Sequence, residues 1–457
     1  MIPCLVLLFM SIFSPSPTLP VPNVFSPYAI PSPSEINQFL SFFTTSTSKH
    51  ETLQAIESDW KPEYEVLLIE VAYLLRDPVT SEIIRTLEKK TDQNFGYDFN
   101  SWYEWLWNKE QAVLPDYDNF KAQLYRPIDP RFTKYFLDRK NTSTIRLDEI
   151  RWGGVKQDGI PPLRSPHMLE ANDAGYLDDD DIVFGIEING DVRAYPKRIL
   201  AWHEMFVDTV GGIPVAGVYC TLCGTVILYK TRHNGIDHHL GTSGFLYRSN
   251  KLMYDQATQS LWSTIEGKPV LGPLAGKGIE LEYYSVVTTT WGEWKRRHPE
   301  TRVLDIQTGF ARDYDEGAAY RDYFSTDDLM FNTPFKNESL RNKDEIVALR
   351  HPDYPNDQLA IAAEFLEDNP VYTNRIGDLD LVVLTDQSGA NRVYRTDGVR
   401  FRTYDQQDEA IDSTGTTWRV TERNLVAADG RALDRLSSFS AFWFGWYAAF
   451  PRTRLVK

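Results

Sequence analysis

The spacing of apolar residues changes near residue 140 from a helical to a strand-like period, and this change limits the folds open to the chain. Between residues 35 and 136, stretches such as YEVLLIEVAYLLRD and SEIIRTLEKKT place Leu, Ile and Val three or four positions apart, which is typical of helices. From about Ser143 onward, short apolar runs alternate with turn residues, as in INGD and PLAGKG. The sequence therefore predicts an α+β protein with a helical N-terminal domain over residues 35–140 and a mainly β domain after it.

Two of the expected helices have recognisable ends. The stretch DFNSWYEWLWNKE opens with an N-cap candidate, either Asp98 or Asn100, whose side chain can accept hydrogen bonds from free backbone N–H groups. Within the β region, TTWGEWKRRHPE starts in a run of threonines and stops before Pro299. We expect a short helix there.

The first 34 residues have the composition of an export segment and a tether. Residues 1–20 contain an apolar core from Ile2 to Phe13, which is too short to span a bilayer but suits a signal peptide. No Lys or Arg precedes this core, so a disordered apolar N-terminus is the alternative. Residues 21–34 are rich in Pro and Ser and predict a tether. We expect an extracytoplasmic protein, periplasmic or secreted, that contacts a membrane only through the N-terminal segment if that is retained.

The charge of the chain excludes one large class of partners. The formal net charge is -16 at pH 7, and no run of five or six basic residues occurs. Nucleic-acid binding depends on basic surfaces that follow the phosphates, so we exclude it. The expected partner is an unidentified small molecule or protein.

The β region contains a loose internal repeat of residues 141–340 and 341–457. DIVFGIEINGDVRAYPKRIL can be laid on DEIVALRHPDYPNDQLAIAAEFL, and VYCTLCGTVILYK on VLTDQSGANRVYR. The aligned pairs are Cys220 with Thr385, Cys223 with Ser388, Gly224 with Gly389 and, nearly, Trp262 with Trp418. The second copy keeps the turn glycine but lacks both sulfurs, so the turn itself does not require cysteine.

Several long motifs resemble a known family. WGGVKQDGIPPLRSP, INGDVRAYPKRILAWHEMFVDTVGGIPVAGVYCTLCGTVILY, TSGFLYRSNKLMYDQATQSLWSTIEGKPVLGPLAG and AFWFGWYAAFPRTRLV closely resemble the bacterial family called domain of unknown function 3179. The resemblance runs from about residue 145 to the C-terminus, and residues 35–136 resemble the helical extension of some members. It implies an often exported protein without an established activity, so the chemistry must be argued from the side chains.

The Cys-x-x-Cys-Gly motif at Cys220 and Cys223 suits two kinds of chemistry. Two thiolates at this spacing can bind one soft metal ion, or they can close a redox-active disulfide. No second Cys-x-x-Cys is present, so a closed metal site must recruit histidine or a carboxylate. The flanking strand–turn–strand pattern favours a metal over a thioredoxin-like redox site, which would lie in a βαβ unit.

His203 is the best-placed third ligand. It lies seventeen residues before Cys220, and its counterpart in the second copy is near Asn369, so the imidazole and both sulfurs are lost together. The sequence predicts a Cys2His site for copper or zinc, with Glu204 and Asp255 as candidate catalytic carboxylates. The alternative for His203 is a partly buried ring that bonds a backbone carbonyl beside Trp202.

A non-enzymatic function is also open. In that case the chain is a binding or scaffold module, and Cys220–Cys223 is an inert disulfide. A bridge that closes so short a loop constrains the unfolded chain weakly, so stability alone is a poor reason for it.

Overall fold

The computed structural model describes residues 35–457, apart from 45–47, 77, 110–115 and 138–141. The chain forms two compact units, one of residues 1–139 and 151–157 and one of residues 140–150 and 158–457. The predicted signal segment and tether lie outside the described residues. Among the described helices, none combines the length and apolar character that crossing a bilayer requires.

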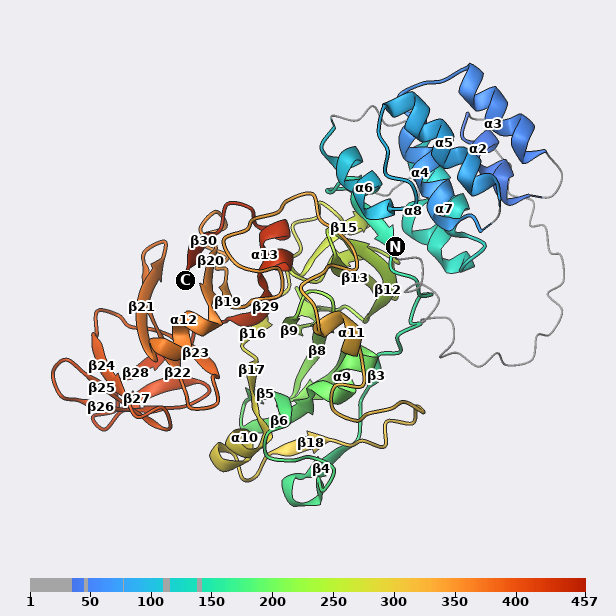
Figure 1. Ribbon diagram of the computed structural model, residues 1–457. Helices are drawn as coiled ribbons and strands as arrows, with labels where there is room; N and C mark the ends of the chain where they lie inside the picture. Colours follow the sequence, from blue (N-terminus) through green and yellow to red (C-terminus); the bar gives the residue numbers. More distant parts are fainter. Residues whose placement is uncertain (1–34, 45–47, 77, 110–115, 138–141) are drawn as a thin grey trace. The chain divides into compact units, whose positions relative to one another are not determined.

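The described part of the first unit is helical (Figure 1). Asp98 caps the helix foreseen at this point, since its carboxylate accepts from the backbone N–H groups of Asn100 and Ser101. The α-helices are α2 (Asn37–Leu40), α3 (Lys49–Ser58), α4 (Tyr64–Leu74), α5 (Val79–Thr91), α6 (Phe99–Trp107), α7 (Tyr117–Tyr125) and α8 (Thr133–Phe136). The 3-10 turns are η1 (Ser41–Phe43) and η2 (Pro130–Phe132), and β2 (Ile150–Trp152) crosses the boundary between the units.

The first half of the second unit contains three main sheets. One has the order β17 (Val287–Thr290), β5 (Ile182–Ile188), β6 (Asp191–Pro196), β18 (Arg302–Leu304) and β4 (Met168–Glu170), and β6 and β18 are parallel. The next has the order β16 (Tyr283–Tyr284), β9 (Thr225–Lys230), β8 (Ile213–Cys220), β7 (Met205–Val210) and β3 (Leu163–Arg164). The third includes, in order, β1 (Thr142–Ser143), β15 (Lys268–Gly272), β14 (Leu261–Ser263), β13 (Asn250–Asp255) and β12 (Leu240–Tyr247).

Short elements connect these strands. The helices are α9 (Lys197–His203) after β6, α10 (Trp291–Arg297) after β17, and α11 (Arg321–Phe324); the 3-10 turns are η3 (Leu147–Glu149) and η4 (Ala171–Asp173). A two-stranded ribbon joins β10 (Arg232–His233) to β11 (Ile236–Asp237). Thr290 caps α10, which confirms the short helix expected before Pro299.

The second half of this unit has its own sheets. One has the order β29 (Phe439–Phe442), β19 (Glu345–Leu349), β20 (Leu359–Ala362) and β30 (Arg454–Val456), with β20 and β30 parallel. Another is β21 (Val371–Ile376), β22 (Leu379–Thr385) and β23 (Asn391–Arg395), and the last is β24 (Phe401–Tyr404), β25 (Glu409–Asp412), β26 (Thr417–Val420), β27 (Asn424–Ala427) and β28 (Ala432–Asp434). The helices are α12 (Ala363–Asp368) and α13 (Trp443–Ala449).

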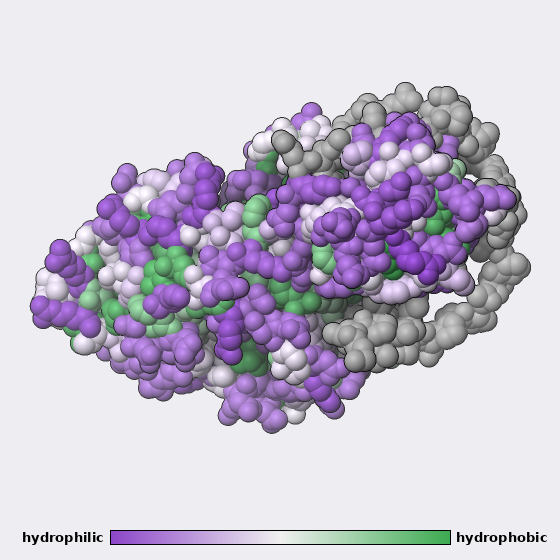
Figure 2. Space-filling view, turned by 45° about the horizontal axis from the view of Figure 1, so that its top comes forward, coloured by the Kyte–Doolittle hydropathy of each residue, from purple (hydrophilic) through white to green (hydrophobic). Residues whose placement is uncertain are grey.

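The two halves of the second unit share a hydrophobic core. One cluster joins Val218 and Ile227 of the β8–β9 hairpin to Ile346 of β19 and Trp446 of α13. On the face drawn in Figure 2, hydrophilic residues cover most of the described surface. The fold is α+β, and the shared core holds the β8–β9 turn against the C-terminal half.

Candidate functional site

The two cysteines lie where β8 turns into β9. Cys220 is the last residue of β8, and Cys223 lies in the turn before β9. Gly224 has a φ of 60°, and a Cβ atom there would lie 2.7 Å from the ring of Phe442, so both the backbone and the packing require glycine. The backbone N–H of Phe442 donates to the carbonyl oxygen of Cys223 at 2.8 Å, which ties the turn to β29.

Both cysteines are free thiols inside an apolar cluster. Cys220 is 2% exposed and Cys223 is 0% exposed. The other buried members of the cluster are Leu222, Leu246, Tyr323, Phe331, Phe442 and Phe444. The Sγ of Cys223 donates to the carbonyl oxygen of Cys220 at 3.9 Å, so the second side chain is turned back toward the first residue.

The surroundings separate the two thiols electrostatically. Burial and the charge of Glu204 raise the pKa of the Cys220 thiol, but a hydrogen bond from Cys223, the charge of Lys251 and a backbone hydrogen bond from Lys251 outweigh them, and the net pKa is lowered. Burial and the neighbouring Cys220 both raise the pKa of Cys223 well above its usual value. Cys220 is therefore the thiol that ionises more readily.

A buried ion pair between Lys251 and Glu204 lies beside the thiols. The Nζ of Lys251, on β13, donates to the backbone oxygen of Glu204 at 2.9 Å and lies 3.1 Å from its Oε2, and the two side chains are 6% and 8% exposed. The hydroxyls of Thr221 and Tyr320 donate to Glu204 Oε1 at 2.7 Å and 3.1 Å. Both carboxylate oxygens thus have donors, Oε2 from the ammonium and Oε1 from the two hydroxyls.

Glu204 occupies a backbone conformation that usually selects glycine. It follows the last residue of α9 with a φ of 55°, a left-handed conformation that is unfavourable for a residue with a side chain. Such strain persists where the surroundings hold the residue in place, and it gathers at functional sites. We infer that the contacts of the Glu204 carboxylate offset the free-energy cost of the strained backbone.

His203 is buried and both of its ring nitrogens have partners. Its Nδ1 lies 2.9 Å from the carbonyl oxygen of Pro161, and its Nε2 lies 2.5 Å from the hydroxyl of Tyr314. Burial lowers the pKa of His203, which favours the neutral ring. Because a carbonyl can only accept, Nδ1 carries the proton and Nε2 accepts from Tyr314. The His203 ring therefore bonds a backbone carbonyl, as in the alternative to metal ligation that the sequence left open.

Asp255 belongs to the turn at the end of β13. Its Oδ1 accepts from the backbone N–H and the hydroxyl of Thr258 at 2.8 Å and 2.9 Å, and its Oδ2 lies 3.3 Å from Nδ1 of His238. These contacts give Asp255 a structural role in the β13–β14 turn. A catalytic role for it stays a prediction.

The predicted metal ligands do not form a three-donor cluster. Within the residues that the structure describes, no group of three or more His, Cys, Asp or Glu side chains could hold a metal ion. The structure brings Cys220, Cys223 and Glu204 into one neighbourhood, while the imidazole of His203 is bonded to Pro161 and Tyr314. The Cys2His centre for copper or zinc stays a prediction.

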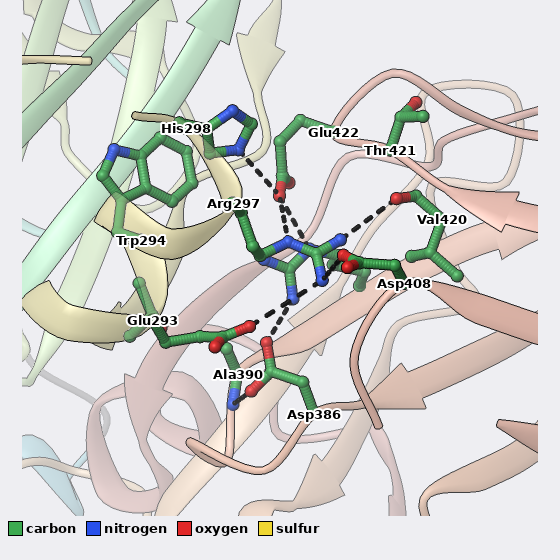
Figure 3. Close-up of polar contacts among 12 residues, drawn as sticks. Glu293, Trp294, Arg297, His298, Asp386, Ala390, Asp408, Val420, Thr421 and Glu422 are labelled. Carbon is green, nitrogen blue, oxygen red and sulfur yellow. Dashed lines mark hydrogen bonds and ion pairs between the residues drawn. The ribbon is translucent and has the colours of Figure 1, made fainter. Parts of the chain in front are cut away.

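A second buried cluster of charged side chains lies at the turn between β22 and β23 (Figure 3). Arg392 is fully buried and donates to Asp386 at 2.6 Å and to Glu422 at 2.8 Å. Glu422 also bonds Arg435, and Arg297 at the end of α10 points toward it. Burial raises the pKa of Glu422, but the surrounding arginines outweigh burial and hold the pKa well below its usual value. The network binds the β22–β23 turn to its neighbours.

Sequence reasoning missed several residues of the thiol site. Lys251, Tyr320 and Tyr323 come from separate segments that only the fold brings together, and Thr221 lies inside the Cys-x-x-Cys motif without a feature that marks it as a donor to Glu204. One local signal was present, because a lysine inside the apolar strand NKLMYD must be paired if it is buried.

Comparison with known proteins adds the family. The family model described as "Protein of unknown function (DUF3179)" matches residues 157–453, which is more than half of the chain. The chain therefore belongs to this family, as the sequence motifs predicted. No curated protein and no solved structure matches the chain.

Proposed function

We propose that the chain carries a dithiol–disulfide redox centre, with Cys220 as the attacking thiol and Cys223 as the resolving thiol. The observation that carries this proposal is the pair of adjacent reduced thiols beside the buried ammonium of Lys251. The pKa of Cys220 is lowered and that of Cys223 is raised, and this difference supports the assignment of roles because the thiolate is the nucleophile in exchange reactions.

The reaction balances without another cofactor. The Cys220 thiolate attacks one sulfur of a reactant disulfide, which forms a mixed disulfide and releases the other sulfur as a thiolate. Cys223 then loses its proton and attacks the Cys220 sulfur, which forms the Cys220–Cys223 bond and releases the second thiol. The cysteine pair loses two electrons, and the reactant disulfide gains them.

Glu204 has a positioning role in this proposal. Its carboxylate and backbone oxygen hold Lys251, and Thr221 and Tyr320 hold the carboxylate in turn. A buried lysine needs such partners to remain charged. The charge of Lys251 lowers the pKa of Cys220 while the charge of Glu204 opposes it, so the part of Glu204 is to place the ammonium beside the thiol.

Export is part of the same proposal. An apolar segment at Ile2–Phe13 supports passage through a secretory route, and an extracytoplasmic compartment supplies disulfides for a dithiol to exchange with. The reactant is a small molecule or a protein that carries a disulfide. Fusion of residues 1–34 to a reporter that is active only after export tests this part.

The redox test uses the full chain, fully reduced, in mixtures of reduced and oxidised glutathione. Mass spectrometry of protease digests should find a Cys220–Cys223 disulfide whose yield follows the glutathione ratio. Cys223→Ser should accumulate a mixed disulfide at Cys220, and Cys220→Ser should react more slowly at Cys223. A folded protein whose thiols stay reduced at every ratio contradicts the proposal.

A metal centre is the second candidate, because two adjacent sulfurs are soft donors suited to copper or zinc. For His203 to be the third donor, its ring would have to leave Pro161 and Tyr314. Metal analysis of the purified wild type and of Cys220→Ser, Cys223→Ser and His203→Ala decides between the two. Stoichiometric metal that all three variants lose supports the metal centre, and a bridge that neither exchanges nor binds metal supports the scaffold alternative.

We also propose that residues 141–340 and 341–457 are degenerate copies of one fold. The order β17-β5-β6-β18 is matched by β29-β19-β20-β30, with a parallel final pair in each, and β7-β8-β9 is matched by β21-β22-β23. A helix follows the second strand in each copy, α9 in the first and α12 in the second. The elements thus recur in the same chain order.

Side-chain contacts support the duplication independently. Trp294 Nε1 donates to Thr301 Oγ1 at 3.0 Å, and Trp446 Nε1 donates to Thr453 Oγ1 at 2.9 Å. An arginine–aspartate pair next to these threonines recurs as well, in Arg302–Asp191 and Arg454–Asp357, and each aspartate accepts from a turn glycine, Gly211 or Gly377. In an experimental structure these contacts should superpose when one half is laid on the other.

A further inference from the structure

Residues 314–331, named here the cover segment, close the thiol site from one side. The segment contributes Tyr323 and Phe331 to the apolar cluster around the thiols, and further side chains of it pack on that cluster, namely Tyr320, Phe324, Leu329 and Met330. Within these residues, all of which the structure describes, α11 is the single helix and has four residues. A reactant cannot reach the buried sulfurs while this segment is in place.

Three tyrosine hydroxyls fasten the cover segment to the site. Tyr314 donates to Nε2 of His203 at 2.5 Å, Tyr320 to Oε1 of Glu204 at 3.1 Å, and Tyr323 to the carbonyl oxygen of Leu222 at 2.7 Å. Their acceptors are the end of α9, the residue after it and the turn between the cysteines. The cover is therefore held to the thiol turn and its ion pair by these three hydrogen bonds and by the apolar packing of its side chains on the cluster.

Strain and anchoring differ along the cover segment. Tyr320 has a φ of 57°, a left-handed conformation that is unfavourable for a bulky residue, and Gly317 has a φ of 69° with open space around its Cβ position. Farther along, Lys343 Nζ donates to the carbonyl oxygens of Thr326, at 2.6 Å, and Tyr323. One end is thus anchored, and a strained, open stretch lies between Tyr314 and Tyr323.

We propose that the cover segment is a gate for the thiol pair, which opens at residues 317–320 when Tyr320 and Tyr323 release their acceptors, and which admits a disulfide-bearing reactant. This inference rests on the proposed dithiol function. It assigns Tyr320 and Tyr323 a role in access, and it separates the chemistry of Cys220 from the step that exposes it.

The test measures how fast iodoacetamide alkylates Cys220 and Cys223 in the reduced, folded full chain. Tyr320→Phe and Tyr323→Phe each remove one hydroxyl bond and keep the ring. Loss of the neutral Tyr323 bond raises the open fraction, and with it the alkylation rate, by about two- to tenfold, and loss of the Tyr320 bond to a carboxylate raises it by about tenfold or more. Tyr394→Phe is the matched control, because its hydroxyl donates to the backbone oxygen of Thr421 at 2.5 Å in a different sheet.

Faster alkylation in the two cover variants with an unchanged rate in Tyr394→Phe supports the gate. Equal rates in all proteins, or equal acceleration in the control, overturn it, because the thiols would then be exposed by general unfolding. Disulfide formation with oxidised glutathione is followed in the same variants. If no disulfide forms in any of them while alkylation still differs, the gate stands and the dithiol function fails.

Discussion

Replacing Lys251 with methionine removes the ammonium of the buried pair while keeping a side chain of similar length. Glu204 then stays in a setting where its side chain is 8% exposed, with the hydroxyls of Thr221 and Tyr320 as its remaining donors. Removing one partner of a buried ion pair typically costs 3–5 kcal/mol. Because two hydroxyl donors remain, we expect the lower end, a loss of about 3 kcal/mol in the free energy of unfolding.

Urea unfolding of the full chain, followed by the circular dichroism of the β-sheets, measures this loss. The double variant Lys251→Met with Glu204→Gln removes both charges and should recover about 2 kcal/mol relative to the single variant. A cost below about 1 kcal/mol for the single variant would mean that the pair is not buried in solution as described. A double variant less stable than Lys251→Met would refute the coupling.

Three other perturbations follow from the contacts. Glu422→Gln removes the shared carboxylate of the ionic network and should cost about 3 kcal/mol or more in urea unfolding, whereas Asp429→Asn, in an exposed pair, should leave stability unchanged. Gly445→Ala places a Cβ atom 2.6 Å from the Cβ atom of Cys223, which is too close, so the side chain of Cys223 must shift. Disulfide formation with oxidised glutathione should therefore slow, and an unchanged rate would contradict this packing. Burial raises the pKa of Asp191, but hydrogen bonds from two arginines and a backbone N–H outweigh burial and lower the pKa from 3.8 to about 2. The stabilisation by this carboxylate is therefore complete above about pH 4 and is lost as the pH falls toward 2. In Asp191→Asn, the free energy of unfolding should depend less on pH in this range.

The classes and ends of several elements could be predicted from the sequence. The sequence narrowed one cap to Asp98 or Asn100 and another to a run of threonines, because N-capping depends on a few neighbouring residues, and the structure has Asp98 and Thr290 as the caps. The change from helices to strands near residue 140 follows from periodicity alone. The pairing of strands such as β6 with β18 could not be foreseen, because it joins segments more than a hundred residues apart and periodicity carries no information on partners.

The candidate site was predictable in its two cysteines and in Glu204, but not in the residues that surround them. Cys220 and Cys223 are recognisable from their spacing, but the direction in which His203 points depends on Pro161 and Tyr314, which lie far away in the sequence. Lys251, the buried lysine beside the thiols, belongs to strand β13, and the sequence does not reveal which strands pack next to β13. The choice of His203 as a third metal ligand rested on its separation from Cys220 in the sequence, and it was therefore a weaker inference than the pairing of the two cysteines.

Contacts of the β8–β9 turn with the C-terminal half have a consequence for synthesis. Cys223 is bonded by Phe442 and packed by Gly445, which the ribosome adds long after the cysteines. In a partly synthesised chain, both thiols are therefore expected to be exposed to oxidants in solution. Chains cut short before Phe442 are therefore expected to crosslink with one another.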